Sequence, residues 1–378
     1  MRIATSISDT GQARAEVTWE DANRPAVNLS IECERDIYAD PNGFLLACYL
    51  PAWHAGERRV SLDQAVCPIL RANLSSAVQT LARWNRYLGP PPIIEAPREV
   101  RLPQGGVAMF LSGGVDSLAS LRTNQLTLPK THPEAISAAI LVDYQKIQGV
   151  ADSETDARYH ERAHILRSVC ADAGIEPILL RTNARSLNSS MDFWMRVYHG
   201  ALLAGLAHSL STRFRKVHIA ATFDSANLGP WGSHPLLDPF YSTAHVQIGH
   251  HGLEMSRFAK TAIVADWPVA LNNLNVCVSR RSDGKNCGRC EKCLRTMLAL
   301  LGIGKLAECE AFEKGDLAAA DLRGLVISND YQLSCYRDVA ASLKERGRVD
   351  LVKAIDRAIA AYANPFNRWR RSLRSIRV

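Results

Sequence analysis

From Val107 onward, short apolar runs alternate with longer segments of helical periodicity, and this alternation limits the folds open to the chain. It predicts an α/β protein in which a parallel sheet carries helices on both faces. Ligands of such sheets bind at the carboxyl ends of the strands. Polar clusters directly follow the apolar runs, so we expect one shared site at that edge. The expected strands are 107–111, 135–143, 175–183 and 216–222.

The first hundred residues follow a different pattern. Short, partly alternating apolar segments at 13–20, 26–34 and 43–50 predict strands, and a segment at 67–88 has helical spacing. Residues 89–106 contain five prolines and three glycines, a composition typical of a linker. We therefore expect a small β-rich domain with its linker at 1–100, an α/β domain at 101–275, and a cysteine-containing helical region with a basic tail at 276–378.

Composition restricts the class of protein. Hydrophobic residues make up 47% and charged residues 22% of the chain, as in ordinary soluble globular proteins. No apolar run approaches the roughly 20 residues that a membrane span needs. The N-terminus has no apolar core behind Arg2, so we expect no signal peptide and a cytoplasmic protein. In a reducing compartment, clustered thiolates are expected to bind a metal rather than form disulfides.

The positive charge is concentrated at the C-terminus. The formal net charge is +7, but the last eleven residues carry five arginines and no acid, which leaves only +2 on the other 367. This tail, with Trp369, could bind RNA through its phosphates and stack on a base. A solvated or membrane-surface tail remains an alternative, because an arginine run alone carries no sequence information.

A glycine loop joins the first of the expected strands to a helix. In the stretch VAMFLSGGVDSLAS, Gly113 and Gly114 allow a tight turn that a ligand can approach closely. The hydroxyls of Ser112 and Ser117 and the N-terminus of the helix make this turn a cup for phosphate. The lysine of a Walker motif is absent. Asp116 stands in its place and is expected to hold Mg²⁺ against the phosphates, or else simply to cap the helix.

The loop sequence SGGVDS resembles the PP-loop of the N-type ATP pyrophosphatases, which cleave ATP to AMP and pyrophosphate while adenylating a substrate. The resemblance implies a HUP-like (adenine nucleotide alpha hydrolase) fold for 101–275. It also implies that the loop binds the pyrophosphate part of ATP and that the end of the second strand contacts adenine. The implied ATP-binding residues are Ser112, Gly113, Gly114, Val115, Ser117, Val142 and Gln145.

Four cysteines form a second motif. Cys277, Cys287, Cys290 and Cys293 have the spacing C-x9-C-x2-C-x2-C, which lets four thiolates converge on one Zn²⁺. Four protein ligands close the coordination sphere, so the zinc is expected to be structural. An iron–sulfur cluster is the alternative for four thiolates. The six remaining cysteines are scattered and are expected to be buried as small apolar side chains.

The PP-loop and the cysteines together resemble the 7-cyano-7-deazaguanine synthase family of queuosine biosynthesis, over about residues 105–300. Lys260 matches a family lysine whose charge would meet ATP phosphates, and with Asp116 it is the implied catalytic pair. Gln145 is similar to the glutamine of the family's Tyr-Gly-Gln, but the glycine is missing. The histidine and glutamate that follow it in the family are displaced here to His160 and Glu161.

The segment 222–252 lies where the synthase family holds its deazaguanine carboxylate. It is expected to be a Gly/Pro-rich polar loop, whose side chains either recognise a substrate or cap turns. The pattern differs enough to predict a different substrate. Extended relatives occur in bacterial defence and biosynthetic operons, which implies a protein or peptide partner. The candidate substrate residues are Asp224, Ser225, Asn227, His234, Asp238 and Arg257, and Ser233, His250 and His251 also carry hydrogen-bonding groups here.

These features predict an ATP-dependent carbon–nitrogen ligase. The enzyme would adenylate a small-molecule carboxylate, and ammonia or an amine would then attack to give an amide or nitrile. One alternative is a tRNA-modifying PP-loop enzyme. Others are a synthase-like component that acts on a protein or peptide through its N-terminal domain or tail, and a non-enzymatic nucleotide-binding subunit. Release of pyrophosphate would distinguish the enzyme alternatives from the non-enzymatic nucleotide-binding subunit.

Overall fold

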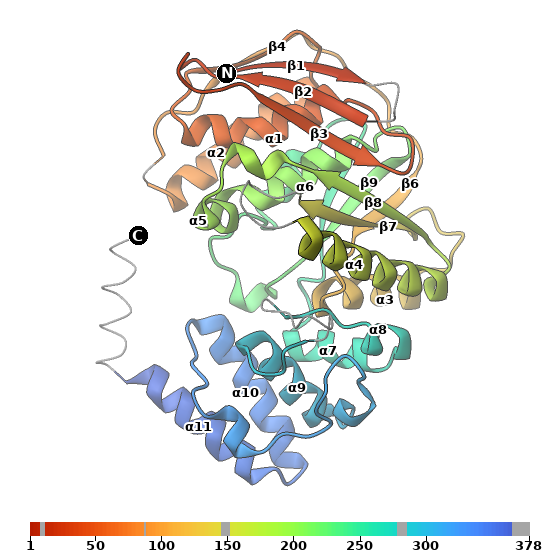
Figure 1. Ribbon diagram of the computed structural model, residues 1–378, viewed down its shortest axis with the longest axis vertical. Coiled ribbons are helices and arrows are strands. Elements are labelled where there is room, and N and C mark those ends of the chain that lie inside the picture. The colour runs from red at the N-terminus through yellow and green to blue at the C-terminus, as the bar shows by residue number, and fades with distance from the viewer. Residues whose placement is uncertain (8–11, 87, 145–151, 278–285, 365–378) are drawn as a thin grey trace. The chain divides into compact units, whose positions relative to one another are not determined.

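The computed structural model confirms the α/β class and contains a mostly parallel sheet of ten strands (Figure 1). The order of the strands is β10-β9-β6-β7-β8-β3-β2-β1-β4-β5. None of the described helices is both long and apolar enough to cross a membrane. The structure describes residues 1–7, 12–86, 88–144, 152–277 and 286–364.

The parallel part of the sheet corresponds to the alternating region of the sequence. Neighbouring strands from β10 to β8 all pair in parallel. Most residues of β6 and β7 are buried, because helices cover both faces of a parallel sheet and leave no face in water. These strands are β6 (Gly106–Phe110), β7 (Ile136–Tyr144), β8 (Glu176–Thr182), β9 (Phe214–Ala220) and β10 (Gln247–His251). The strand β10 was not expected, since 222–252 was predicted to be a loop.

The N-terminal strands extend this same sheet. An antiparallel meander of β1, β2 and β3 pairs with β8 through β3, and β4 and β5 continue the sheet beyond β1. The alternate residues of β2 are buried, as expected for a strand with one covered face. The strands expected at 13–20 and 26–34 are therefore present as β2 and β3, but they share one sheet with the parallel strands β6 to β10. The bounds of the N-terminal strands are β1 (Arg2–Ile7), β2 (Gln12–Thr18), β3 (Val27–Cys33), β4 (Arg59–Leu62) and β5 (Ile93–Glu95).

The strand predicted at 43–50 is wrong, because this segment lies within helix α1 (Pro41–His54). The side chain of Asp40 caps the helix by accepting a hydrogen bond from the backbone N–H of Asn42, and Pro41 suits the first helical position. Every residue from Pro41 to Trp53 is buried. A helix buried on all sides has no polar face, so its sequence lacks the periodicity that identifies helices.

The chain divides into two compact units. The larger comprises 1–112, 123–221 and 229–251 and contains the whole sheet, and the smaller comprises 113–122, 222–228 and 252–378. Neither unit begins or ends at the boundaries expected near residues 100 and 275. In the smaller unit, helix α10 packs against α9 and α11, and α7 packs against α9.

The remaining helices of the larger unit are α2 (Pro68–Trp84), α4 (Asp152–Ala173), α5 (Met191–Phe193), a π-helical turn (Trp194–Tyr198) and α6 (His199–His208), with 3₁₀ turns η1 (Ala184–Leu187) and η4 (Asp238–Tyr241). Helix α3 (Val115–Thr127) belongs to both units. The smaller unit has α7 (Arg257–Ala265), α8 (Pro268–Asn272), α9 (Glu291–Ile303), α10 (Asp330–Glu345) and α11 (Val349–Ala363), with η3 (Ser225–Asn227), η5 (Leu306–Glu308) and η6 (Ala319–Leu322).

Candidate functional site

The glycine loop has the setting that its sequence predicts. Strand β6 ends at Phe110 and helix α3 begins at Val115. Gly113 has a φ of 79°, in the left-handed region where a side chain would be strained. Its carbonyl accepts a hydrogen bond from the backbone N–H of Asn275 at 2.8 Å, which ties the loop to a segment 162 residues further on. The hydroxyl of Ser117 donates to the carbonyl of Gly114 at 3.1 Å.

Within the smaller unit, two cations meet the carboxylate of Asp116. Arg257 Nη1 donates to Asp116 Oδ2 at 2.6 Å, and Lys260 Nζ lies 3.6 Å from Oδ1. Both cations come from the first turns of α7, where a spacing of three residues puts them on one face of the helix. The side chain of Lys260 is only 1% exposed. The predicted catalytic pair is therefore in contact, and Arg257, predicted to bind substrate, joins it.

Burial and charge act differently on the two cations. Burial disfavours the charged form of Arg257, but attraction and hydrogen bonding by Asp116 together with smaller effects of neighbouring groups outweigh this cost and raise the pKa of Arg257. Burial lowers the pKa of Lys260, and the positive charge of Arg257 opposes the stabilising effect of Asp116. An anion that binds beside Lys260 would relieve this repulsion and favour its ammonium form.

The other candidate substrate residues fall into two groups. In the smaller unit, Asp224 caps the turn η3: its Oδ1 accepts from the backbone N–H of Ala226 at 3.0 Å and from Asn227 Nδ2 at 2.8 Å. The backbone N–H of Ser225 donates to the carbonyl of Leu253. These contacts agree with the capping role that was the alternative for this set. His234 and Asp238 belong to the larger unit.

In the larger unit, Asp238 is fully buried and collects several donors. Ser233 Oγ donates to its Oδ2 at 2.7 Å, the backbone N–H of His234 lies 3.3 Å from Oδ1, and His250 Nδ1 lies 2.7 Å from Oδ2. The sequence placed His250 on a loop without assigning it a partner. The pattern QIGHH could have indicated the short strand that carries it.

The residues expected at adenine are only partly described. Val142 lies in β7 and is buried, so only its backbone can serve a ligand. Its carbonyl accepts a weak hydrogen bond from Arg162 Nη2 at 3.4 Å. Gln145 lies outside the described residues, and so does the arginine-rich tail at 368–378. The adenine contact and the RNA-binding tail therefore stay predictions.

The four predicted metal ligands do come together in the smaller unit. Their Sγ–Sγ distances are 4.0 Å for Cys277 and Cys290, 3.8 Å for Cys287 and Cys293, and 3.4 Å for Cys290 and Cys293. A tetrahedral ion with Zn–S bonds of about 2.3 Å places its sulfurs about 3.8 Å apart. Disulfides require about 2.05 Å and are excluded. The thiols therefore fit a structural zinc ion.

Backbone N–H groups beside the four cysteines favour the thiolate form that binds a metal. Burial raises the pKa of the Cys287 thiol, but hydrogen bonds from the backbone N–H groups of Arg289 and Cys290 outweigh it and lower the pKa to about 6. Asn286, which the sequence did not single out, accepts from the backbone N–H groups of Val276 and Cys277 at 3.0 and 3.1 Å. Its amide therefore fixes the first cysteine beside the other three.

A second set of potential metal ligands is already neutralised. Asp40, His208 and His245 are buried together in the larger unit. However, the guanidinium of Arg101 donates to Asp40 Oδ2, and Ser211 Oγ donates to the same oxygen at 3.0 Å. Because Arg101 already balances the charge of this carboxylate, the cluster is better explained as a structural network.

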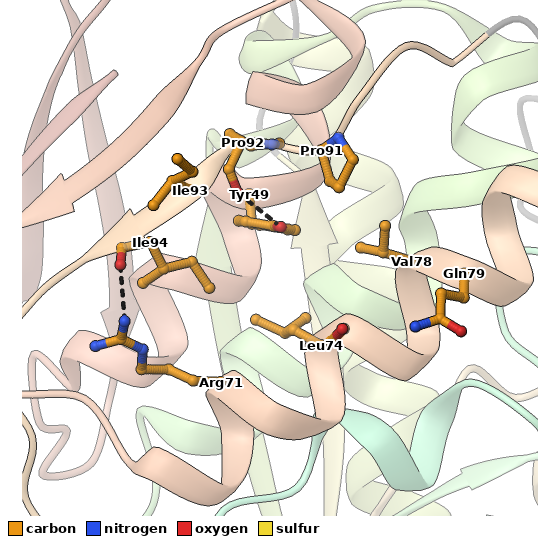
Figure 2. A pocket seen from close by; sticks show the side chains of 10 residues that line it. Tyr49, Arg71, Leu74, Val78, Gln79, Pro91, Pro92, Ile93 and Ile94 are labelled. Carbon is orange, nitrogen blue, oxygen red and sulfur yellow. Dashed lines mark hydrogen bonds between the residues drawn. The ribbon is translucent and has the colours of Figure 1, made fainter.

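The larger unit also has a hollow of about 430 Å³ between α2 and the segment 91–94 (Figure 2). Two of its polar side chains are hydrogen-bonded to the protein backbone. Arg71 Nη2 donates to the carbonyl of Ile94 at 2.8 Å, and the Tyr49 hydroxyl donates to the carbonyl of Pro92 at 3.0 Å. Ser75 and Gln79 also line the hollow, but its described lining includes no acidic, histidine or cysteine side chain that could activate a nucleophile, so it is not a candidate active site.

No family model matches the chain, and comparisons with curated proteins and with solved structures found no significant match. The relationship to the PP-loop enzymes stays a prediction from the motifs.

Proposed function

We propose that the chain is an ATP-dependent carbon–nitrogen ligase that activates a carboxylate by adenylation. The observation that supports this most is the pair of cations, Arg257 and Lys260, held on the carboxylate of Asp116 at the start of the helix that follows the glycine loop. Positive charge beside the N-terminus of a helix favours a polyphosphate. The smaller unit thus has the donors that a departing pyrophosphate requires.

The reaction follows from the chemistry of carboxylates. A carboxylate resists attack because its leaving group would be oxide. Attack of one carboxylate oxygen on the α-phosphorus of ATP releases pyrophosphate and gives an acyl-adenylate, whose leaving group is the stable monoester AMP. Ammonia or an amine then forms the amide. Arg257 and Lys260 would stabilise the charge that builds on pyrophosphate during the first step.

Asp116 fits a magnesium ligand. Its Oδ1 accepts no hydrogen bond within 3.5 Å from the described residues, with Lys260 Nζ 3.6 Å away, and carboxylate oxygen is a preferred ligand of Mg²⁺. When bound, Mg²⁺ would neutralise phosphate charge and polarise the phosphorus–oxygen bond. Asp116 itself would also orient Arg257, since their charged hydrogen bond is short.

The cysteine knuckle would serve this chemistry only through structure. Four thiolates leave no open position on zinc for a substrate or water. Cys290 is the N-cap of α9, and α9 packs against α7, which carries Arg257 and Lys260. Zinc would therefore hold α9 in the position that supports the phosphate-binding face of α7.

Product analysis tests the proposed function. Purified protein would be incubated with ATP, magnesium and the small-molecule fraction of a cell extract, and the nucleotides would be separated by chromatography. We expect AMP and pyrophosphate, in amounts that depend on the extract fraction. High-resolution mass analysis of that fraction identifies the amide or nitrile. ADP and phosphate as the main products would contradict the adenylation reaction, and no nucleotide cleavage would favour a binding subunit.

A further inference from the structure

Arg185 of the larger unit carries a positive charge that has no counter-ion among the described residues. It lies in the turn η1, which follows the carboxyl end of β8, and its side chain is half-buried. No hydrogen bond or ion pair joins its guanidinium to any residue that the structure describes, and its Nε is fully buried. Buried polar groups in folded proteins are nearly always hydrogen-bonded, so an open guanidinium requires an explanation.

An aromatic side chain holds this guanidinium in place. The Cζ of Arg185 lies 4.4 Å from the centre of the Trp194 ring. Trp194 begins the π-helical turn, and its ring meets the ring of Tyr144 edge-on, with 5.1 Å between the centres. Stacking on an indole orients an arginine, but it uses none of the five N–H donors, which point outward in the plane of the guanidinium. The donors of Arg185 therefore stay available to a ligand.

The turn that carries Arg185 is tied to the sheet at the edge where ligands bind. Asn183, directly after β8, accepts a hydrogen bond from the backbone N–H of Ser30 in β3 at 2.9 Å. Thr182, the last residue of β8, pairs with Tyr144, the last residue of β7. Because β7 and β8 run in parallel, Arg185 and Tyr144 both lie at the carboxyl edge of the sheet, where α/β proteins bind ligands.

Two acidic residues that adjoin this group in the sequence already have partners. Asp143 Oδ2 lies 3.2 Å from Nε of Arg181, and Asp192 Oδ1 lies 2.6 Å from Nε of Arg196. Burial disfavours the charged form and lowers the pKa of Arg185, but a guanidinium keeps its proton at neutral pH. A buried charge without a counter-ion is costly, and an anion from outside the chain would remove that cost.

We propose that Arg185 and Trp194 form a binding site for an organic carboxylate. One cation in a half-buried site matches one negative charge, whereas a phosphate monoester carries nearly two. The planar guanidinium binds a planar carboxylate through two parallel hydrogen bonds. The indole beside it suits an apolar body on the same ligand. π-Helical turns are rare and frequently lie at functional sites, which agrees with this assignment. The site belongs wholly to the larger unit and does not rest on the proposed function.

The test measures binding to the intact protein in the absence of ATP. The probe is 4-fluorobenzoate, whose ¹⁹F signal broadens when the molecule exchanges with a protein site. The neutral 4-fluorobenzamide has nearly the same shape and no charge, and inorganic phosphate and unlabelled benzoate serve as competitors. The variants are Arg185→Gln, which removes the charge, and Arg185→Lys, which keeps the charge without the planar fork. The matched control is Arg196→Gln, an exposed arginine of the same segment.

We expect wild-type protein to broaden the signal of the benzoate and not that of the benzamide. Arg185→Gln should weaken benzoate binding by about tenfold or more, as loss of hydrogen bonds to a charged group does. Arg185→Lys should weaken it by a smaller factor. Arg196→Gln should bind within about twofold of wild type, because an exposed ion pair contributes little. The urea midpoint of Arg185→Gln should equal or exceed that of wild type, since the substitution removes an unpaired charge.

Several results would overturn the inference. Absence of broadening in the wild type, or equal broadening of the benzamide, would exclude a carboxylate site. Stronger competition by phosphate than by unlabelled benzoate would assign the site to a different anion. Wild-type affinity in Arg185→Gln, or an equal loss in Arg196→Gln, would exclude Arg185 as the ligand-binding residue. Lower urea midpoints for both Arg185 variants would give this arginine a structural role. None of these outcomes bears on adenylation, which product analysis tests separately.

Discussion

Asp116 is the residue on which the proposed adenylation depends most. We expect Asp116→Ala to reduce pyrophosphate release by at least about 100-fold, because it removes the candidate magnesium ligand and the partner of two cations. A buried pair that loses one partner typically costs about 3–5 kcal/mol, and the partial exposure of Asp116 reduces that cost. Release would be measured with purified protein, and denaturant unfolding would show whether the protein remains folded.

A milder change nearby provides the control. Ser117→Ala removes one hydroxyl of the loop and should cost about 1–3 kcal/mol of binding or activation free energy, the range for a hydrogen bond to a charged group. Pyrophosphate release from Asp116→Ala at the wild-type rate would contradict the role given to Asp116. The sequence could assign a role to Asp116 but not its partners, because Asp116 and Arg257 lie 141 positions apart.

At the scale of elements, the sequence predicted strands better than it predicted what joins them. The strands β6 to β9 lie within a residue or two of their expected positions, since runs buried on both faces have few competing interpretations. Helix α1 was misread because such a run is also consistent with a fully buried helix. Strand β10 was missed because its neighbours are rich in glycine, proline and polar residues.

Two glycines explain how closely α1 and α6 pack. A Cβ added to Gly205 would lie 2.7 Å from the carbonyl oxygen of Gly43, and a Cβ added to Gly43 would lie 2.6 Å from that of Gly205. Real Cβ atoms do not approach other heavy atoms this closely, so α1 and α6 would have to move apart. We expect Gly205→Ala to lower the free energy of unfolding by about 1–3 kcal/mol, as overpacking in a core does. Urea unfolding measures the change.

The matched control for this substitution is Gly229→Ala, also in the larger unit, where an added Cβ would have no neighbour within 4 Å. It should change the unfolding free energy by no more than about 0.5 kcal/mol. Equal stability of Gly205→Ala and wild type would show that the two helices can move apart without cost.

The cysteine knuckle should hold one zinc ion per chain, because its sulfur distances match tetrahedral thiolate ligation. Elemental analysis of freshly purified protein measures the metal. Cys290→Ala should lose zinc and solubility, since structural zinc contributes folding free energy. Cys309→Ala, which removes a buried thiol of the same unit outside the knuckle, should keep zinc. Iron with visible absorbance, or protein without metal, would exclude a zinc knuckle.

At the scale of the whole molecule, the architecture depends on pairing between strands that are far apart in the sequence, which the sequence alone could not predict. The N-terminal strands suggested a separate domain, but β3 pairs with β8, about 150 residues later. Without β3, the edge of β8 would expose unpaired backbone groups. Periodicity reports which residues are buried but not what covers them, so the sequence could predict the strands and not the single sheet that they share.

The reaction proposed for the whole chain makes a prediction about isotopes. Only attack of a carboxylate oxygen on the α-phosphorus joins that oxygen to AMP, and it remains there when the amine displaces AMP from the acyl carbon. Carboxylate substrate labelled with ¹⁸O should therefore transfer one labelled oxygen to AMP, as mass measurement of the separated nucleotide would show. Without a carboxylate, cleavage of ATP should be slow, because an enzyme that forms a reactive adenylate excludes water from it. Unlabelled AMP would mean that water attacks the α-phosphorus, and it would rule out the acyl-adenylate while leaving nucleotide binding by the glycine loop open to a different reaction.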